Sequence, residues 1–172
     1  MALFGRGMNA TVPGRHRPDR STLLKSRTFP EFGLSECGMK IANVVSIIAL
    51  TFLAITSIVG AIPMIMDPSG GLLHMPISMI EHSPFHSFLI PGIILLVANG
   101  FLSLVILVAT ARRARRYEML VCFQGFVLTG WISIEMIMMR MAAWPHYIYL
   151  GVALVLIVSG LVLARKAEAV AS

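Results

Sequence analysis

Four long apolar stretches alternate with short polar ones along the chain. They cover about residues 41–65, 84–110, 118–139 and 147–164. A helix needs about 20 predominantly apolar residues to cross the hydrocarbon of a bilayer, and each stretch comes close to that length. The pattern therefore predicts four membrane-spanning helices.

The rest of the chain is too short and too apolar to form a second, soluble core. Of the 172 residues, 57% are hydrophobic and only 13% are charged, which is too little charge to cover the surface of a soluble domain of this size. Residues 1–40 are basic and rich in Gly and Pro and show no helical or strand period, so we expect them to be largely disordered or to lie along the membrane surface. Residues 165–172 form a short tail. The apolar segment 72–81 is interrupted by Pro76 and is expected to lie in the membrane interface.

Basic residues gather on one side of the predicted spans. Seven Lys or Arg precede the first span, four lie at 112–116 and two follow the fourth span, whereas Arg140 is alone on the other side. By the positive-inside rule, both termini and the 112–116 loop are cytoplasmic, and residues 66–86 and 140–146 face the opposite side. This distribution accounts for the net charge of +6 without a nucleic-acid partner.

Short links between the spans make neighbouring helices antiparallel. The expected fold is an all-α membrane protein, an up-down-up-down bundle of four transmembrane helices.

The stretch EHSPFHSFLIPG at 81–92 is the densest in polar groups and prolines. Ser83-Pro84 is a good N-cap and first-turn pair, so a helix could begin there and bend at Pro91; alternatively residues 84–89 form a separate turn and Pro91 opens the span. In both cases the stretch serves as a polar entry to the membrane, and its Glu and His side chains also suit a metal or proton site.

The third span carries a polar stripe. Gln124, Leu128, Trp131 and Glu135 lie on one helical face, which should turn toward the bundle. The second span offers Asn99 and Ser103 at a similar depth. A hydrogen bond from Gln124 to either side chain is expected to hold the two helices together.

Glu135 is a carboxylate inside a predicted span, and such residues mark candidate functional sites. Its depth matches an outer layer of polar side chains, so a candidate outer-surface site comprises Glu81, His82, His86, Glu135, Arg140 and His146. The alternatives are that Glu135 pairs with Arg140 or extends to the aqueous interface. No metal-binding motif appears in the chain, and the sequence does not identify a cofactor.

Residues 71–100, GLLHMPISMIEHSPFHSFLIPGIILLVANG, and the spans around them resemble an uncharacterised group of small bacterial four-span membrane proteins. The matching residues are Ser83-Pro84-Phe85, Phe88 and Ile90-Pro91-Gly92, and the resemblance covers about residues 60–164. It implies a location in the bacterial cytoplasmic (inner) membrane. It implies no activity, so no functional residue is carried over.

Three functions follow from these patterns. The first is a non-enzymatic scaffold or accessory subunit, whose partners would be the lipid bilayer and other membrane subunits or a second copy; the absence of nucleotide and nucleophile motifs favours it. The second is a protein with an outer-surface Glu/His site for a metal, haem, quinone or proton transfer. The third is a small transporter that uses the polar face of the third span.

The assignment of sides is directly testable. In a variant without the native Cys37 and Cys122, single cysteines are introduced at Ser69 and at Ala114 and treated with a membrane-impermeant thiol reagent on intact cells. We expect labelling at position 69 without permeabilisation and at position 114 only after it. The reverse pattern would overturn the orientation.

Overall fold

The computed structural model describes residues 29–81 and 83–171, and the regular elements in those ranges are all helical. By its internal contacts the chain divides into two units, residues 1–35 and 36–172. Of the first unit, only the opening residues of one helix are described. The elements are the helices α2 Phe29–Met66, α3 Leu89–Ile94, α4 Leu102–Ala111, α5 Tyr117–Met139 and α6 Trp144–Ala171, the π-helical segment η3 Leu95–Phe101, and the short 3₁₀ turns η1 Gly71–Leu73 and η2 Ile77–Ile80.

Four helical stretches in the described chain are long and apolar enough to cross a membrane. They are Gly38–Met66, Leu89–Ala111, Tyr117–Met139 and Trp144–Arg165, the second being α3, η3 and α4 in continuous succession. The predicted all-α, four-span class is therefore confirmed. The predicted ends agree to within a few residues, because the apolar runs themselves decide where a span lies.

Two helix starts differ from the predictions. α2 begins at Phe29, inside the segment expected to be disordered or on the surface. Extending an existing helix is far easier than nucleating one, so residues 29–40 continue the apolar helix that follows. Residues 1–28 lie outside the described ranges.

The second span begins at Leu89, between the two predicted starts. Pro91 consequently lies in the first turn, where its missing N–H removes no helical hydrogen bond, so the bend expected there has no cause. Residues 83–88 form a separate turn, as in the second alternative, but the helix begins at Leu89 and not at Pro91. The Ser83 hydroxyl donates to the carbonyl of Ile80 at 2.8 Å and accepts from the Phe85 N–H at 3.2 Å.

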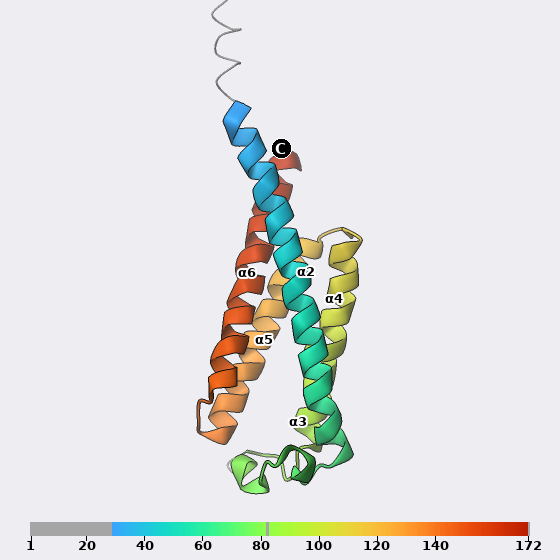
Figure 1. Ribbon diagram of the computed structural model, residues 1–172, viewed down its shortest axis with the longest axis vertical. Coiled ribbons are helices and arrows are strands. Elements are labelled where there is room, and N and C mark those ends of the chain that lie inside the picture. The colour runs from blue at the N-terminus through green and yellow to red at the C-terminus, as the bar shows by residue number, and fades with distance from the viewer. Residues whose placement is uncertain (1–28, 82, 172) are drawn as a thin grey trace, which may run out of the picture. The chain divides into compact units, whose positions relative to one another are not determined.

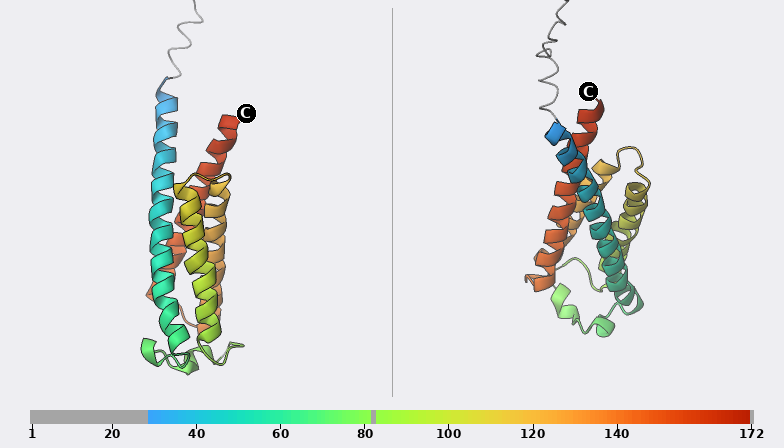
Figure 2. Two further views of the ribbon diagram at one scale, coloured as in Figure 1. Left: turned by 90° about the vertical axis from the view of Figure 1, so that its right-hand side faces the viewer. Right: turned by 45° about the horizontal axis from the view of Figure 1, so that its top comes forward.

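Figure 1 shows how the connections are distributed at the ends of these helices. The loop of residues 67–88 and the turn from α5 to α6 lie at one end, and the loop at 112–116 lies at the other. The turned view in Figure 2 shows the same separation. The sides of the membrane on which these ends lie stay a prediction.

The loop of residues 67–88 is anchored at both of its ends. The Asp67 carboxylate accepts the N–H groups of Ser69 at 3.1 Å and Leu72 at 3.0 Å. The hydroxyl of Ser69 and these N–H groups hold the pKa of the Asp67 carboxyl below its ordinary value. The N–H of Phe88 donates to the carbonyl of Pro68 at 3.0 Å, and the Phe88 ring is buried. The start of the second span is thus fixed against the end of the first.

Glycines allow three close helix contacts. A methyl group at Gly125 of α5 would lie 2.8 Å from the carbonyl oxygen of Ala153 in α6, and one at Gly160 of α6 would lie 2.6 Å from the backbone nitrogen of Cys122. A methyl group at Gly92 of α3 would lie 2.8 Å from the Cβ of Met64 in α2. Since lipid gives helices no hydrophobic drive to associate, such close packing is a main source of stability.

Two clusters of buried side chains fill the interior between the helices. The larger lies between α2, α4, α5 and α6 and contains Leu50, Leu53, Ile106, Val121, Leu128, Trp131, Ile132 and Leu156 with smaller neighbours. The smaller contains Met64, Ile80 and Phe88 and packs the loop of residues 67–88 against the end of α2.

The contact at Gly125 leads to a prediction about stability. Gly125→Ala should lower the free energy of unfolding by about 1–3 kcal/mol, because the new methyl meets backbone atoms that cannot move aside. Gly130→Ala is the matched control: it is in the same helix, and nothing lies within 4 Å of its added methyl. Unfolding by SDS titration in mixed micelles measures both. Equal effects of the two changes would contradict the close α5–α6 contact.

Candidate functional site

A π-helical segment interrupts the second span. In η3 the backbone follows an i to i+5 pattern, and the Leu102 N–H donates to the carbonyl of Val97. The segment places Asn99 and Gly100 in the interior, where both are buried. Such segments are frequent at functional sites. Sequence reasoning missed it, and the only signal was an Asn-Gly pair within an apolar run.

Gln124 of α5 lies opposite this segment. Its Nε2 donates to the carbonyl of Ala98 at 3.2 Å and to Oδ1 of Asn99 at 3.4 Å. Of the two partners considered for Gln124, the structure therefore brings it to Asn99. Ser103 is also buried, but its hydroxyl is not bonded to Gln124.

Three polar atoms around this contact have no hydrogen-bond partner in the described part of the chain. They are Nδ2 of Asn99, Oγ of Ser103 and Oε1 of Gln124. Reversing the Gln124 amide would place its oxygen against the carbonyl oxygen of Ala98, so the orientation in which Nε2 donates is the favourable one. Leaving a buried polar group unpaired costs about 1–3 kcal/mol, so this contact joins the helices at a considerable expense in free energy.

Farther along α5, Glu135 lines a small, partly open cavity. The cavity has a volume of about 110 Å³ and is lined by residues of α2, η3, α5 and α6. Its polar lining comprises Thr56, Ser57, Trp131, Glu135 and Tyr149. The indole Nε1 of Trp131 has no hydrogen-bond partner in the described residues. The polar stripe predicted for the third span thus faces this interior, and Glu135 is half-buried within it.

The other members of the candidate outer-surface site differ in their exposure. Glu81, His86 and Arg140 are exposed, and His82 lies outside the described residues. His146 is buried near the start of α6, where its Nδ1 accepts the Ala143 N–H at 3.0 Å.

The hydrogen bond from Ala143 to His146 stabilises the turn from α5 to α6. Among residues 29–81 and 83–171, no three His, Cys, Asp or Glu side chains are grouped so that they could hold a metal ion. The described residues therefore do not assemble the metal-ligand set that was one expectation from the sequence.

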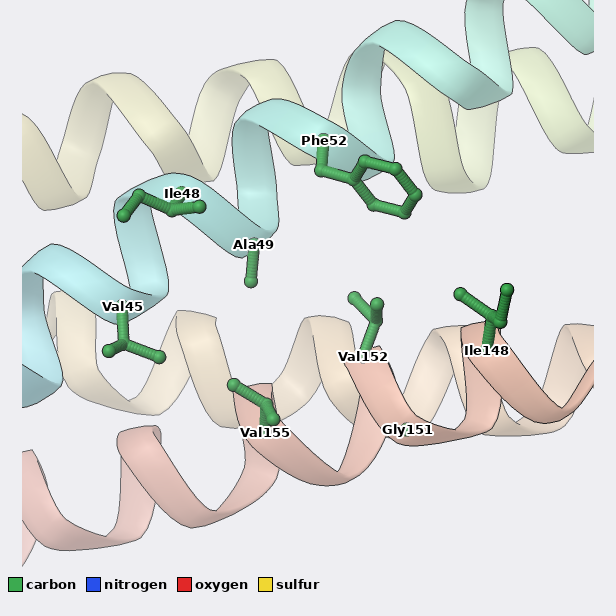
Figure 3. Close-up of a pocket in the computed structure, with 8 residues that line it drawn as sticks. All are labelled: Val45, Ile48, Ala49, Phe52, Ile148, Gly151, Val152 and Val155. Carbon is green, nitrogen blue, oxygen red and sulfur yellow. The ribbon is translucent and has the colours of Figure 1, made fainter.

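An apolar groove lies between α2 and α6. Figure 3 shows its lining, which comprises Val45, Ile48, Ala49 and Phe52 from α2 and Ile148, Gly151, Val152 and Val155 from α6. Its volume is about 450 Å³. Nothing in the sequence distinguished these positions from ordinary lipid-facing ones.

An aromatic pair connects the lining of the groove to the lining of the Glu135 cavity. Phe52 lines the groove, Tyr149 lines the cavity, and their ring centroids are 6.1 Å apart at a tilt of 32°. The two hollows are therefore neighbours with different linings: one is wholly apolar and the other contains the carboxylate.

No family model, curated protein or solved structure matches the chain. The resemblance carried by Ser83-Pro84-Phe85 and its neighbours stays a prediction, and the functional argument depends on the groove and the cavity alone.

Proposed function

We propose that the protein is a non-enzymatic integral membrane scaffold or accessory subunit that holds another transmembrane helix in the groove between α2 and α6. On the charge distribution, we further propose that it resides in the bacterial cytoplasmic membrane with both termini inside. The observation that carries the proposal is the groove itself, with its wholly apolar lining.

Small residues between larger ones make the groove suited to a helix. Ala49 and Gly151 are small, whereas Ile48, Phe52 and Ile148 are large and exposed around them. Interfaces between membrane helices are enriched in small residues, because these let two backbones approach closely. A methyl group at Gly151 would meet nothing within 4 Å, so packing within the described chain does not require a glycine there. A partner helix would explain the glycine, because a glycine at position 151 lets the partner's backbone approach closely.

The linings of the groove and of the Glu135 cavity also help to decide between the scaffold, the ligand-binding site and the transporter. The groove offers no polar side chain with which to orient a substrate. The Glu135 cavity, at about 110 Å³, is well below the roughly 300–1,000 Å³ of pockets for drug-sized ligands. This size disfavours haem or quinone at Glu135. A small transporter that uses the polar face of α5 is the second candidate, favoured by the inward position of Glu135.

Site-specific photocrosslinking tests the proposal in cells. A photoreactive residue at Ile148, which lines the groove, should yield a protein adduct of defined mass, whereas one at Ile137, exposed on α5, should not. An adduct of twice the chain mass would identify the partner as a second copy, and any other mass would identify a different subunit.

Two matched glycine variants complete that experiment. Gly151→Leu fills the groove and should abolish the adduct at position 148, while Gly130→Leu, equally open but outside the groove, should preserve it. Adducts with lipid alone at both positions, or an adduct unaffected by Gly151→Leu, would contradict a helix in the groove.

A further inference from the structure

We propose that the cavity around Glu135 is a hydrated proton-binding site within the membrane span. The inference is independent of the partner helix, because it concerns a different hollow, and it assigns the bundle a chemistry that the apolar groove cannot provide. The bound species is a proton on the Glu135 carboxylate, delivered through a few water molecules.

The first argument is the charge environment of Glu135. An ionised carboxylate inside a span is costly unless it is paired, hydrated or protonated. In the cavity lining, α2 contributes Leu53, Thr56, Ser57 and Gly60, η3 contributes Leu95, and α6 contributes Tyr149. None of these is a cation, and the Tyr149 phenol is the only other titratable group among them. A proton is therefore the counter-charge that the lining leaves available.

The second argument is an indole that lies beside the carboxylate. Trp131 is only 7% exposed, lines the cavity one turn from Glu135, and lies close to the Glu135 side chain. Buried indole N–H groups usually find an acceptor. The Glu135 carboxylate is close enough to be that acceptor, directly or through a water molecule, so Trp131 is a donor beside the oxygen that would bind the proton.

The third argument is room for water. A water molecule needs roughly 10–15 Å³ of cavity volume and two to four polar partners. The cavity has a volume of about 110 Å³. Ser57 and Tyr149 contribute hydroxyl groups. The Thr56 hydroxyl donates to the Phe52 carbonyl at 2.8 Å and keeps its lone pairs for a donor. Several waters therefore fit, each with polar neighbours.

The fourth argument is access to the aqueous phase. Glu135 is four residues from Met139, where α5 ends, which is about 6 Å along the helix axis. In the binding step one O–H bond forms on the carboxylate, the proton leaves a hydronium ion in that phase, and a water molecule remains. No oxidant, reductant or second substrate is needed.

The fluorescence of Trp131 can report the protonation of Glu135. The chain has two tryptophans, so Trp144→Phe leaves Trp131 as the sole indole, beside the carboxylate. In lipid nanodiscs, its emission should follow a single reversible titration between about pH 4 and pH 9, a range that spans the values to which buried carboxyls are displaced. Glu135→Gln in the same background should remove the titration completely.

One further variant separates Glu135 from other carboxylates. Glu118→Gln changes the other carboxylate of α5, which is in its first turn, and should leave the titration in place. A titration that survives Glu135→Gln, or no titration at all, would overturn the proposal.

Infrared difference spectra of the unaltered protein provide a test that does not depend on how Glu135→Gln folds. Lowering the pH should produce the carbonyl stretch of a protonated carboxylic acid, and the band should shift promptly in heavy water because the cavity is hydrated. Absence of a titrating band, or one that does not exchange with solvent, would contradict a hydrated proton site.

Discussion

The structure depends on one constraint: in hydrocarbon, a polar group must find its partner inside the protein. Helices satisfy the hydrogen bonds of the backbone. Polar side chains must then lie on the helix faces that turn toward the protein interior. On α5 this sorting turns Gln124, Trp131 and Glu135 inward and leaves apolar residues such as Phe126 and Ile137 exposed. The inward polar face in turn determines where the interhelical hydrogen bond and the Glu135 cavity can form.

Close helix contacts are the second consequence of the same environment. Lipid tails are as apolar as leucine side chains, so helices are held together by tight packing and a few polar bonds. The tight packing is at the backbone contacts of Gly125 and Gly160. The polar bond is the hydrogen bond from Gln124 to Asn99. The groove between α2 and α6 is different, because a methyl group added at Gly151 would meet nothing within 4 Å in the described chain. That contrast is the basis for assigning the groove to a partner.

Much of the fold could be predicted from the sequence, because long apolar runs and a polar stripe of helical period are direct consequences of the bilayer. Their positions correctly indicated the four spans and the face of α5 on which Gln124 and Glu135 lie. The start of the second span at Leu89 could not be predicted, because it depends on the tertiary bond from Phe88 to Pro68. The π-helical segment and the groove were also hidden, since both arise from how helices pack and not from local pattern. Glu81 and His86 are exposed, whereas Glu135 is half-buried, and a shared depth could not predict that difference.

The central claim, that the polar face of α5 is turned inward within a bilayer, is tested most directly by spin-label scanning along α5. Nitroxide labels are placed singly from position 119 to position 137 in lipid vesicles, and their collision rates with oxygen, which concentrates in hydrocarbon, are recorded. We predict a helical period with maxima at Phe123, Phe126, Gly130 and Ile137 and minima at Gln124, Leu128 and Trp131. Maxima at Gln124 and Trp131, or oxygen collision rates without a helical period, would contradict the account.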